Sequence, residues 1–408
     1  MTSFIVEHRC PQCGAPAELD EAERLFECGF CRVRSFLSPP DVFRYLLPHK
    51  APGKELIYFP YWRFKGMLFS CVPGATRHRF IDVSQQAIRS AHFPLSMGFR
   101  TQTQKLRFAT NSGEGNFLTP QTTKADLLKN LTDQFSGPLP KPILHQACIG
   151  ETISLLYAPF YLESKLMDGI LNSALPNTPA NAIEPLLDHP QETQWPIHFL
   201  STLCPQCGWD LSGEKAALAL GCPHCQSVWQ PNGRTFKRVA ASHVPDSRPT
   251  TVYLPFWRIS PQISGIELNS YADLIRVANL PKVPQPGSED QPFHFWSPAF
   301  KARPQSFLNV AAHLTAAQPQ DVMEPGAPAG NARSVTLPLQ EAVESLTLIL
   351  VFFARPRRLI EILLPKIQIE ARHSELIYLP FQEGHHELVH PAMNLAISKN
   401  LLSHGKNL

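Results

Sequence analysis

The sequence of 408 residues lacks a long apolar run. Its most apolar stretch, residues 346–354, is about half as long as the ~20 residues that a membrane-spanning helix needs. We expect it to be a buried strand or a core helix. The first residues also lack the basic and then apolar pattern of a secretory signal. These absences predict a soluble, cytoplasmic protein without a transmembrane segment.

The chain also lacks an excess of charge of one sign. It has 37 Lys and Arg against 34 Asp and Glu, and the net charge of +3 argues against a dedicated binder of polyanions. Only 17% of the residues are charged and 43% are hydrophobic, so the chain can bury a sizeable core and wholesale disorder is excluded. Proline is abundant instead. Its 40 residues, roughly twice the usual share, predict that long helices do not dominate.

Eight of the ten cysteines form two copies of the pattern C-x2-C-x14-C-x2-C. They are Cys10, Cys13, Cys28, Cys31, Cys204, Cys207, Cys222 and Cys225. In a reducing compartment, four closely spaced cysteines indicate a metal site rather than disulfides. A C-x2-C knuckle lets two sulfurs reach one ion from a tight turn, and two knuckles complete a tetrahedron. Cys71 and Cys148 have no such pattern, and we expect buried thiols there.

The four-thiolate donor sets predict two Zn²⁺ ions per chain, with iron as the less favoured metal. A site closed by four sulfurs has no open position for a water nucleophile, so we expect its role to be structural. Metal binding contributes on the order of 10 kcal/mol to the folding of such small modules. The competing hypothesis is a redox dithiol at Cys222-Pro223-His224-Cys225. That chemistry needs a helix start after a strand, whereas each motif here has a partner knuckle.

The similarity between the two halves extends beyond the cysteines. Tyr58 opens Y-F-P-Y-W-R 27 residues after Cys31, and Tyr253 opens Y-L-P-F-W-R 28 residues after Cys225. Weaker matches to this motif lie near the end of each half, Y-A-P-F-Y-L-E from Tyr157 and Y-L-P-F-Q-E from Tyr378. Such a recurrence indicates an internal repeat. We therefore predict a β-rich α+β chain with a tandem duplication, in which each copy is a four-cysteine zinc ribbon followed by a β-rich domain.

The repeat also predicts the domain boundaries. Residues 1–38 are the first zinc ribbon, 39–175 the first β-rich domain, 176–196 a Pro-rich linker, 197–233 the second ribbon and 234–408 the second β-rich domain. Two further Pro-rich insertions, 281–292 and 318–331, are expected to be surface loops. Strands are expected at 56–59, 152–157, 251–254 and 375–379, each ending at or near a proline. Helices are expected at 124–135, 273–278, 339–354 and 393–402.

The two Tyr-x-Pro-aromatic-Trp-Arg segments suit either a binding surface or a core. Tyr, Trp and Arg dominate the hot spots of protein interfaces. A packing solution, however, is expected to recur in both copies of a duplicated chain, whereas a specific ligand site is not. We therefore favour core packing for both segments.

His386-Glu387-Leu388-Val389-His390 matches H-E-x-x-H, which on a helix presents two histidines and a general base to one zinc ion. Pro391 follows at once and biases His390 away from helical geometry. No Asp or Glu follows to supply a third ligand. A zinc hydrolase is therefore the least favoured hypothesis, and the chain is predicted not to be an enzyme. A weak adventitious metal site at His385, His386 and His390 stays open.

The charges around the cysteines bear on nucleic-acid binding. Between Cys10 and Cys31 five acidic residues accompany a single basic one, Arg24. Four thiolates around Zn²⁺ add a charge of about −2 to each site, so the ribbons repel phosphates. Basic residues nevertheless follow the second ribbon at Arg234, Lys237 and Arg238. A nucleic-acid-associated zinc-ribbon protein is therefore the alternative, not the favoured, function.

Cys10-Pro11-Gln12-Cys13-Gly14 and Cys204-Pro205-Gln206-Cys207-Gly208 resemble the C-P-x-C-G knuckle of zinc-ribbon or rubredoxin-like proteins, over about 22 residues per copy. Together with Y-x-P-[FY]-W-R, the ribbons resemble a loosely described set of bacterial zinc-ribbon proteins. Some of these are named after transcription-factor ribbons or primosomal helicase zinc regions, and some accompany membrane-remodelling or band-7-type proteins. The helicase label does not transfer, because G-x-x-x-x-G-K-[ST] is absent.

The favoured function is thus a non-enzymatic zinc-binding scaffold or adaptor that mediates protein–protein interaction. It follows from the closed metal sites, the near-neutral charge and the lack of a convincing catalytic set. The resemblance implies an association with membrane-associated assemblies. The sequence names neither the protein partner nor the oligomeric state.

Overall fold

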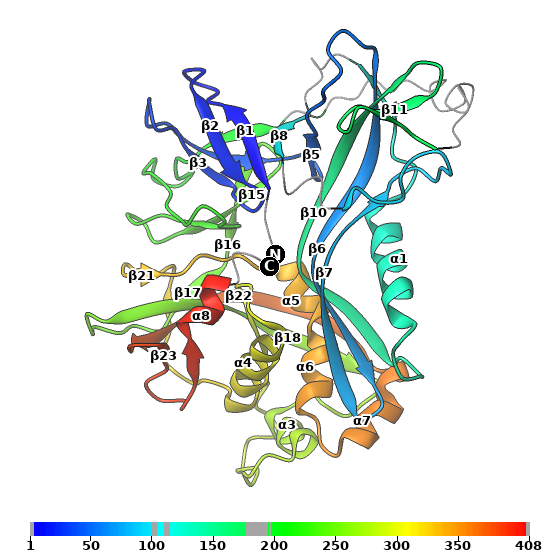
Figure 1. Ribbon diagram of the computed structural model, residues 1–408. Coiled ribbons are helices and arrows are strands. Elements are labelled where there is room, and N and C mark those ends of the chain that lie inside the picture. Colours follow the sequence, from blue (N-terminus) through cyan, green and yellow to red (C-terminus); the bar gives the residue numbers. More distant parts are fainter. Residues whose placement is uncertain (1–3, 99–103, 110–114, 177–194, 196, 405–408) are drawn as a thin grey trace. The chain divides into compact units, whose positions relative to one another are not determined.

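The computed structural model describes residues 4–98, 104–109, 115–176, 195 and 197–404. Strands dominate this part of the chain, in sheets of ten, eight, three and three strands (Figure 1). The β-rich class expected from the sequence is confirmed, whereas the duplication of complete α+β halves stays a prediction. Within the described residues, no helix has the length and apolar character needed to cross a membrane.

The chain packs into two compact units, and neither is one continuous segment. Unit 1 comprises the described residues of Met1–Lys65, Ile81–Gln134 and Glu151–Ser201, and unit 2 those of Gly66–Phe80, Phe135–Gly150 and Thr202–Leu408. Two segments of the first half therefore belong to unit 2. The five domains expected from the sequence stay a prediction, because compactness alone does not show which segments fold independently.

Unit 1 contains a ten-stranded sheet and a three-stranded sheet. Its strands are β1 (Ile5–Arg9), β2 (Pro16–Asp20), β3 (Leu25–Glu27), β4 (Arg34–Ser38), β5 (Phe43–Leu46), β8 (Lys105–Phe108), β9 (Asn116–Phe117), β11 (Leu166–Asp168), β12 (Ser173–Ala174) and β13 (His198–Ser201). The longer strands β6 (Leu56–Val72), β7 (Ala75–Gln86) and β10 (His145–Leu162) run from one unit into the other. Helix α1 (Lys124–Ser136) lies between β9 and β10 in the chain. The ten-stranded sheet has the order β12-β11-β10-β5-β8-β1-β2. In addition, β6 pairs with β10, and β7 and β9 pair with β6.

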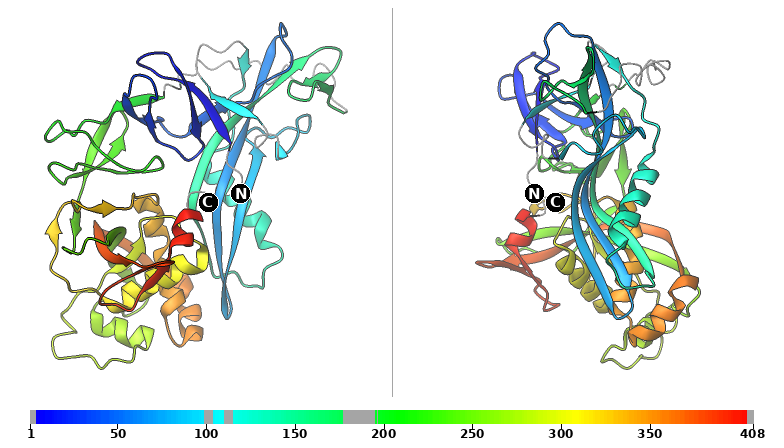
Figure 2. Two further views of the ribbon diagram at one scale, coloured as in Figure 1. Left: turned by 60° about the vertical axis from the view of Figure 1, so that its left-hand side comes forward. Right: turned by 45° about the vertical axis from the view of Figure 1, so that its right-hand side comes forward.

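Unit 2 contains an eight-stranded sheet, a three-stranded sheet and most of the helices. Its strands are β14 (Leu220–Gly221), β15 (Val228–Asn232), β16 (Thr235–Val239), β17 (Ala241–His243), β18 (Thr251–Ser264), β19 (Phe295–Pro298), β20 (Glu324–Pro325), β21 (Asn331–Ala332), β22 (Gln368–Glu383), β23 (Glu387–Val389) and β24 (Ala396–Ser398). Its helices are α3 (Tyr271–Ala278), α4 (Pro304–Ala317), α5 (Leu339–Glu344), α6 (Leu346–Phe353), α7 (Arg357–Leu363), α8 (Lys399–His404) and a 3₁₀ turn at Leu364–Lys366. Helix α4 packs against both β19 and α6, and these helices are yellow and orange in Figure 2.

The long strands continue through prolines at which the sequence suggested that they would end. β6 passes through Pro60, β18 through Pro255 and β22 through Pro380. In a strand, the N–H and the carbonyl of one residue point towards the same neighbouring strand. The carbonyl of Pro255 accepts a hydrogen bond from the N–H of Ala299, which follows β19 directly. The missing N–H of Pro255 therefore faces the short neighbour β19, and the long β18–β22 ladder loses no hydrogen bond.

The helix predictions were partly right. Helices α1 and α3 lie where they were expected, and the apolar stretch is the buried helix α6. The helix expected over 339–354 is divided at Ser345, whose hydroxyl donates to the carbonyl of Ala342 at 2.7 Å. The helix expected over 393–402 is wrong for most of its length, because β24 pairs with β23 there and α8 begins only at Lys399. Helices α4 and α7 were missed.

The core of unit 2 includes side chains from the first half of the chain. Met67 and Phe69 on β6 and Ile149 on β10 are fully buried in the same apolar cluster as Phe307 of α4. The rings of Phe69 and Phe307 are 6.4 Å apart between centroids. The hydrophobic core of the second half is thus completed by segments that precede the expected linker.

Candidate metal centres

Both four-cysteine groups lie in the turns next to short strands. Cys10 and Cys13 connect β1 to β2, Cys28 and Cys31 connect β3 to β4, Cys204 and Cys207 precede β14, and Cys222 and Cys225 connect β14 to β15. In the first group, the N–H of Gly14 donates to the carbonyl of Cys10 at 2.9 Å and that of Arg32 to the carbonyl of Cys28 at 3.0 Å. The corresponding bonds of the second group, Gly208 to Cys204 and Gln226 to Cys222, are 2.8 and 2.9 Å long. All four knuckles are therefore closed by the same backbone hydrogen bond.

The residue after each knuckle has a left-handed backbone. The angle φ is +74° at Gly14 and +75° at Gly208, where glycine meets no steric penalty. The second knuckles place Arg32 at +62° and Gln226 at +57°, which costs a side chain about 1 kcal/mol. Knuckle closure therefore requires this conformation whatever the residue, which explains the glycine of C-P-x-C-G.

The sulfur atoms of each group lie as close together as the ligands of one metal ion. Two Sγ–Sγ distances are 3.7 and 3.6 Å in the first group and 3.6 and 3.5 Å in the second. All four sulfurs of a group lie within 4.8 Å of one another. A tetrahedral ion with metal–sulfur bonds of about 2.3 Å requires edges of about 3.8 Å. The eight predicted cysteines thus come together as two candidate metal sites, and this geometry alone does not separate zinc from iron.

Burial follows the same order in all four knuckles. The first cysteine of each is buried, and Cys10, Cys28, Cys204 and Cys222 are 2–3% exposed. The second is exposed or half-buried. No cysteine forms a disulfide, and the two outside the four-cysteine groups, Cys71 and Cys148, are buried as expected. Burial raises the pKa of Cys71 to about 11, so this thiol is not a reactive thiolate.

Four neighbouring thiols compete for ionisation. Hydrogen bonds from the N–H groups of Cys31 and Phe30 lower the pKa of Cys28 to about 6. The N–H of Val33 acts in the same direction on Cys31, but desolvation and the neighbouring cysteines prevail and raise its pKa to about 12. The second group shows the same division between Cys204, lowered to about 6, and Cys207, raised to about 12. A bound cation removes this conflict, because it favours the thiolate form of every ligand.

A serine and a tryptophan distinguish the second site, and sequence reasoning missed both. The Oγ of Ser227 lies 2.9 Å from Cys225 Sγ and 3.6 Å from Cys204 Sγ. Trp229 Nε1 lies 2.7 Å from the same Oγ. An indole N–H only donates, so the Ser227 oxygen accepts from it and its own hydrogen is available to the sulfurs. Val33 and Ser35 occupy the corresponding positions after the first site.

Two competing site hypotheses lack their required geometry. Cys222 and Cys225 lie in a turn between two strands, whereas a redox dithiol needs the start of a helix. The H-E-x-x-H segment is not helical either, because Glu387–Val389 is strand β23. His390 is buried against Phe381, with its Nδ1 accepting from the N–H of Ala392 at 3.2 Å. Among the described residues, only the two cysteine groups bring three or more ligands within metal-binding distance.

The two aromatic segments are part of the core, as predicted. Tyr61 and Phe256 are fully buried, and Trp62 and Trp257 are nearly so. Trp257 Nε1 donates to the carbonyl of Leu337 at 3.0 Å. In the first segment, Arg63 forms ion pairs with Glu21 and with Asp82. The second arginine, Arg258, pairs with Glu375 at 2.6 Å.

Aromatic side chains are exposed at the tips of the knuckles. Phe30, inside the second knuckle of the first site, is 73% exposed. Trp209, next to the first knuckle of the second site, is 56% exposed and stacks on His224 with ring centroids 5.3 Å apart. A large apolar ring that is left in water beside a closed site is available to a binding partner.

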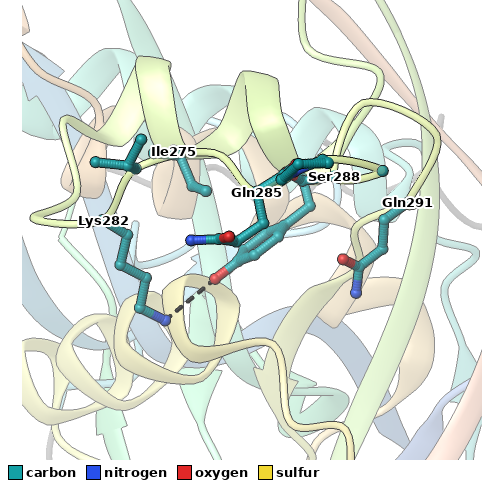
Figure 3. A pocket seen from close by; sticks show the side chains of 9 residues that line it. Ile275, Lys282, Gln285, Ser288 and Gln291 are labelled. Atoms are coloured by element: carbon teal, nitrogen blue, oxygen red, sulfur yellow. Dashed lines mark hydrogen bonds between the residues drawn. The ribbon is translucent and has the colours of Figure 1, made fainter.

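A separate pocket of about 600 Å³ lies between α3 and the loop over 281–292. The ammonium group of Lys282 donates to the hydroxyl of Tyr271 at 3.1 Å, and this hydrogen bond is the dashed line from Lys282 in Figure 3. The lining includes Gln285, Ser288 and Gln291 but no Cys, His, Asp or Glu. The pocket is therefore not a further metal site.

Comparisons of the chain with models of known protein families, with curated proteins and with solved structures found no match.

Proposed function

We propose that the protein is a non-enzymatic scaffold or adaptor with two structural zinc sites, which mediates contacts between proteins. The observation that carries the proposal is the pair of four-sulfur groups, each built from two knuckles with the same backbone hydrogen bond. Cys10, Cys13, Cys28 and Cys31 would hold one ion, and Cys204, Cys207, Cys222 and Cys225 the other. When bound, each ion neutralises thiolate charge and cross-links its two knuckles.

The small size of the ribbons supports a structural role for the metal. In the first ribbon β3 has three residues, and in the second β14 has two. Sheets this small bury too little apolar surface to be stable alone, and metal ligation supplies the missing free energy. Four sulfur ligands leave no position for a substrate or a water nucleophile, which supports a non-enzymatic role.

The exposed knuckle aromatics support the interaction role. Phe30 and the Trp209–His224 stack stand on rigid, metal-closed turns, so their presentation costs little ordering on binding. A Trp anchor such as Trp209 carries much of the affinity at many protein interfaces. The resemblance of the ribbons adds membrane-associated assemblies as a class of protein partner to test.

One observation favours a second candidate function, association with single-stranded nucleic acid. The exposed Trp209–His224 stack offers a ring face to a base, and the same ribbon carries the exposed Arg234, Lys237 and Arg238. Salt-dependent binding of a fluorescent oligonucleotide that is lost in an Arg234→Gln/Lys237→Gln/Arg238→Gln variant would support it. Replacement of Lys282 by Gln is the matched control, because Lys282 is an exposed lysine outside the ribbon.

The decisive experiment is metal content per chain, by mass spectrometry of untagged protein purified without chelators. We expect two zinc ions and negligible iron. Cys13→Ser and Cys207→Ser should each remove one ion, and His386→Ala/His390→Ala should remove none. Predominant iron would contradict the proposal by making the ribbons candidate electron carriers, and a third zinc lost in the histidine variant would reopen the hydrolase hypothesis.

A further inference from the structure

The three-stranded sheet of the first ribbon is completed by a distant strand. In the second ribbon, β14 and β15 carry the knuckle and β16 follows directly through the turn Asn232-Gly233-Arg234. In the first ribbon, β3 and β4 carry the knuckle, but Pro39 and Pro40 end β4, and the next strand, β5, pairs with β8 and β10 instead of β4. The open edge of β4 is instead paired with β13, from beyond the expected linker. β13 therefore occupies the place that β16 has in the second ribbon.

Two sets of contacts tie β13 to the segments that carry the first metal site. It pairs antiparallel with β4 over four positions, from His198 opposite Ser38 to Ser201 opposite Ser35, and β4 begins three residues after Cys31. Phe199 stacks on His8 with ring centroids 4.9 Å apart, and His8 lies two residues before Cys10. The docking surface of β13 thus consists of strands that the two knuckles hold in place.

The two metal sites differ in how their sulfurs are protected. In the second site, the Ser227 hydroxyl reaches Cys225 and Cys204, and Trp229 fixes its orientation. A hydrogen bond to a thiolate ligand lowers its tendency to take up a proton or to be displaced from the metal. The first site has Val33 in place of Ser227, and both of its outer cysteines, Cys13 and Cys31, are exposed. The first site is therefore the one that exchanges its metal more readily.

We propose that the first four-cysteine site is an exchangeable metal site whose occupancy controls the docking of β13 on β4. This rests on the proposed metal binding. With the ion present, the β3–β4 hairpin is rigid and β13 is docked. When the ion leaves, the knuckle opens, the edge of β4 is lost and His198–Ser201 is released. The second site keeps its ion and its local strand β16 under the same conditions.

The first experiment follows zinc release from the full chain into an excess of the chromogenic chelator 4-(2-pyridylazo)resorcinol. We expect two phases, and Cys31→Ser should abolish the fast one while Cys225→Ser abolishes the slow one. Ser227→Ala should accelerate the slow phase by about 10- to 100-fold, the usual effect of losing such a hydrogen bond to a metal ligand. Ser212→Ala is the matched control, because that exposed hydroxyl donates to the carbonyl of Gly221 and not to a cysteine sulfur. A single phase, or earlier loss from the second site, would overturn the assignment.

The second experiment follows hydrogen exchange at β13 and β16 during the same release. Amides of His198–Ser201 should lose protection with the fast phase, and those of Thr235–Val239 only with the slow phase. Because coupling between binding free energies is reciprocal, Phe199→Ala should lower the zinc affinity of the first site and leave that of the second unchanged. This variant keeps all eight ligands, so it tests the coupling even if a cysteine variant fails to fold. If the protein binds two zinc ions but β13 stays protected after the first ion has left, the control of β13 docking by the metal is refuted and the proposed function is not. A native protein that contains no metal would instead refute the proposed function.

Discussion

Replacing Arg63 by methionine should destabilise unit 1 strongly, because this arginine is a buried cation shared by two carboxylates. Arg63 and Glu21 are 3% and 2% exposed. The guanidinium Nε lies 3.4 Å from Glu21, and a second guanidinium nitrogen pairs with Asp82. Methionine keeps much of the side-chain volume, so the loss is mainly electrostatic. Removing one partner of a buried pair costs about 3–5 kcal/mol, and we expect a loss in this range at pH 7.

Hydrogen exchange of the β6 amides in unit 1 measures this loss directly, since it reports local opening free energies in a chain of two units.

A double-mutant cycle decides whether the ion pair is the cause. Glu21→Gln should cost less in the Arg63→Met background than in the native chain, by at least about 1 kcal/mol. Arg258→Met is the matched control in the second aromatic segment. Its side chain is 27% exposed and pairs with one carboxylate, that of Glu375, so a loss nearer 1 kcal/mol is expected. A deficit below about 1 kcal/mol for Arg63→Met, or strict additivity with Glu21→Gln, would refute the reasoning.

Three further predictions concern other parts of the chain. Gln226→Gly should stabilise the second ribbon and raise its thermal midpoint, because it relieves about 1 kcal/mol of strain from the left-handed backbone. Gly208→Ala should introduce a similar strain and lower the midpoint. Calorimetry of the zinc-loaded protein checks both. Burial lowers the pKa of His390 to about 4, so the unfolded chain takes up a proton between pH 6.5 and 4 that the folded chain does not. Stability should therefore fall across this window by up to about 3 kcal/mol, and His390→Asn should fall less steeply in acid-induced unfolding followed by fluorescence. A fragment of residues 197–408 lacks Met67, Phe69 and Ile149 of the unit 2 core, so it should bind an apolar dye and unfold less cooperatively than the full chain; cooperative unfolding without dye binding would show that the second half folds alone.

The cysteine sites were the most predictable part of the protein, because their determinants are local. A C-x2-C knuckle closes through backbone hydrogen bonds within a few residues, so spacing alone predicts that its two sulfurs face one ion. The equal gap of 14 residues in both copies brings the second knuckle to the first without help from the rest of the chain. The strand conformation of the aromatic segments was equally predictable, because these segments are rich in β-branched and aromatic residues.

The strand ends and several helices were not predictable, because neighbours decide them. Whether Pro255 ends β18 depends on which side its missing N–H faces, and that is set by the positions of β19 and β22. The segment 396–398 forms a strand rather than a helix because β23 provides a partner. The H-E-x-x-H match failed for the same reason, since hairpin pairing with β22 outweighed the helical spacing of the two histidines.

By itself, the sequence determined the eight candidate metal ligands, their division into two groups and the β-rich character of the chain, since these depend on residue type and short-range spacing. Only the tertiary structure decided that segments of the first half complete the core of unit 2, and that β13 fills the edge left open where Pro39 and Pro40 end β4. It also decided that Ser227 and Trp229 set the second site apart from the first. These features depend on contacts between residues far apart in sequence or on the direction of one hydroxyl, and neither leaves a periodic pattern in the chain.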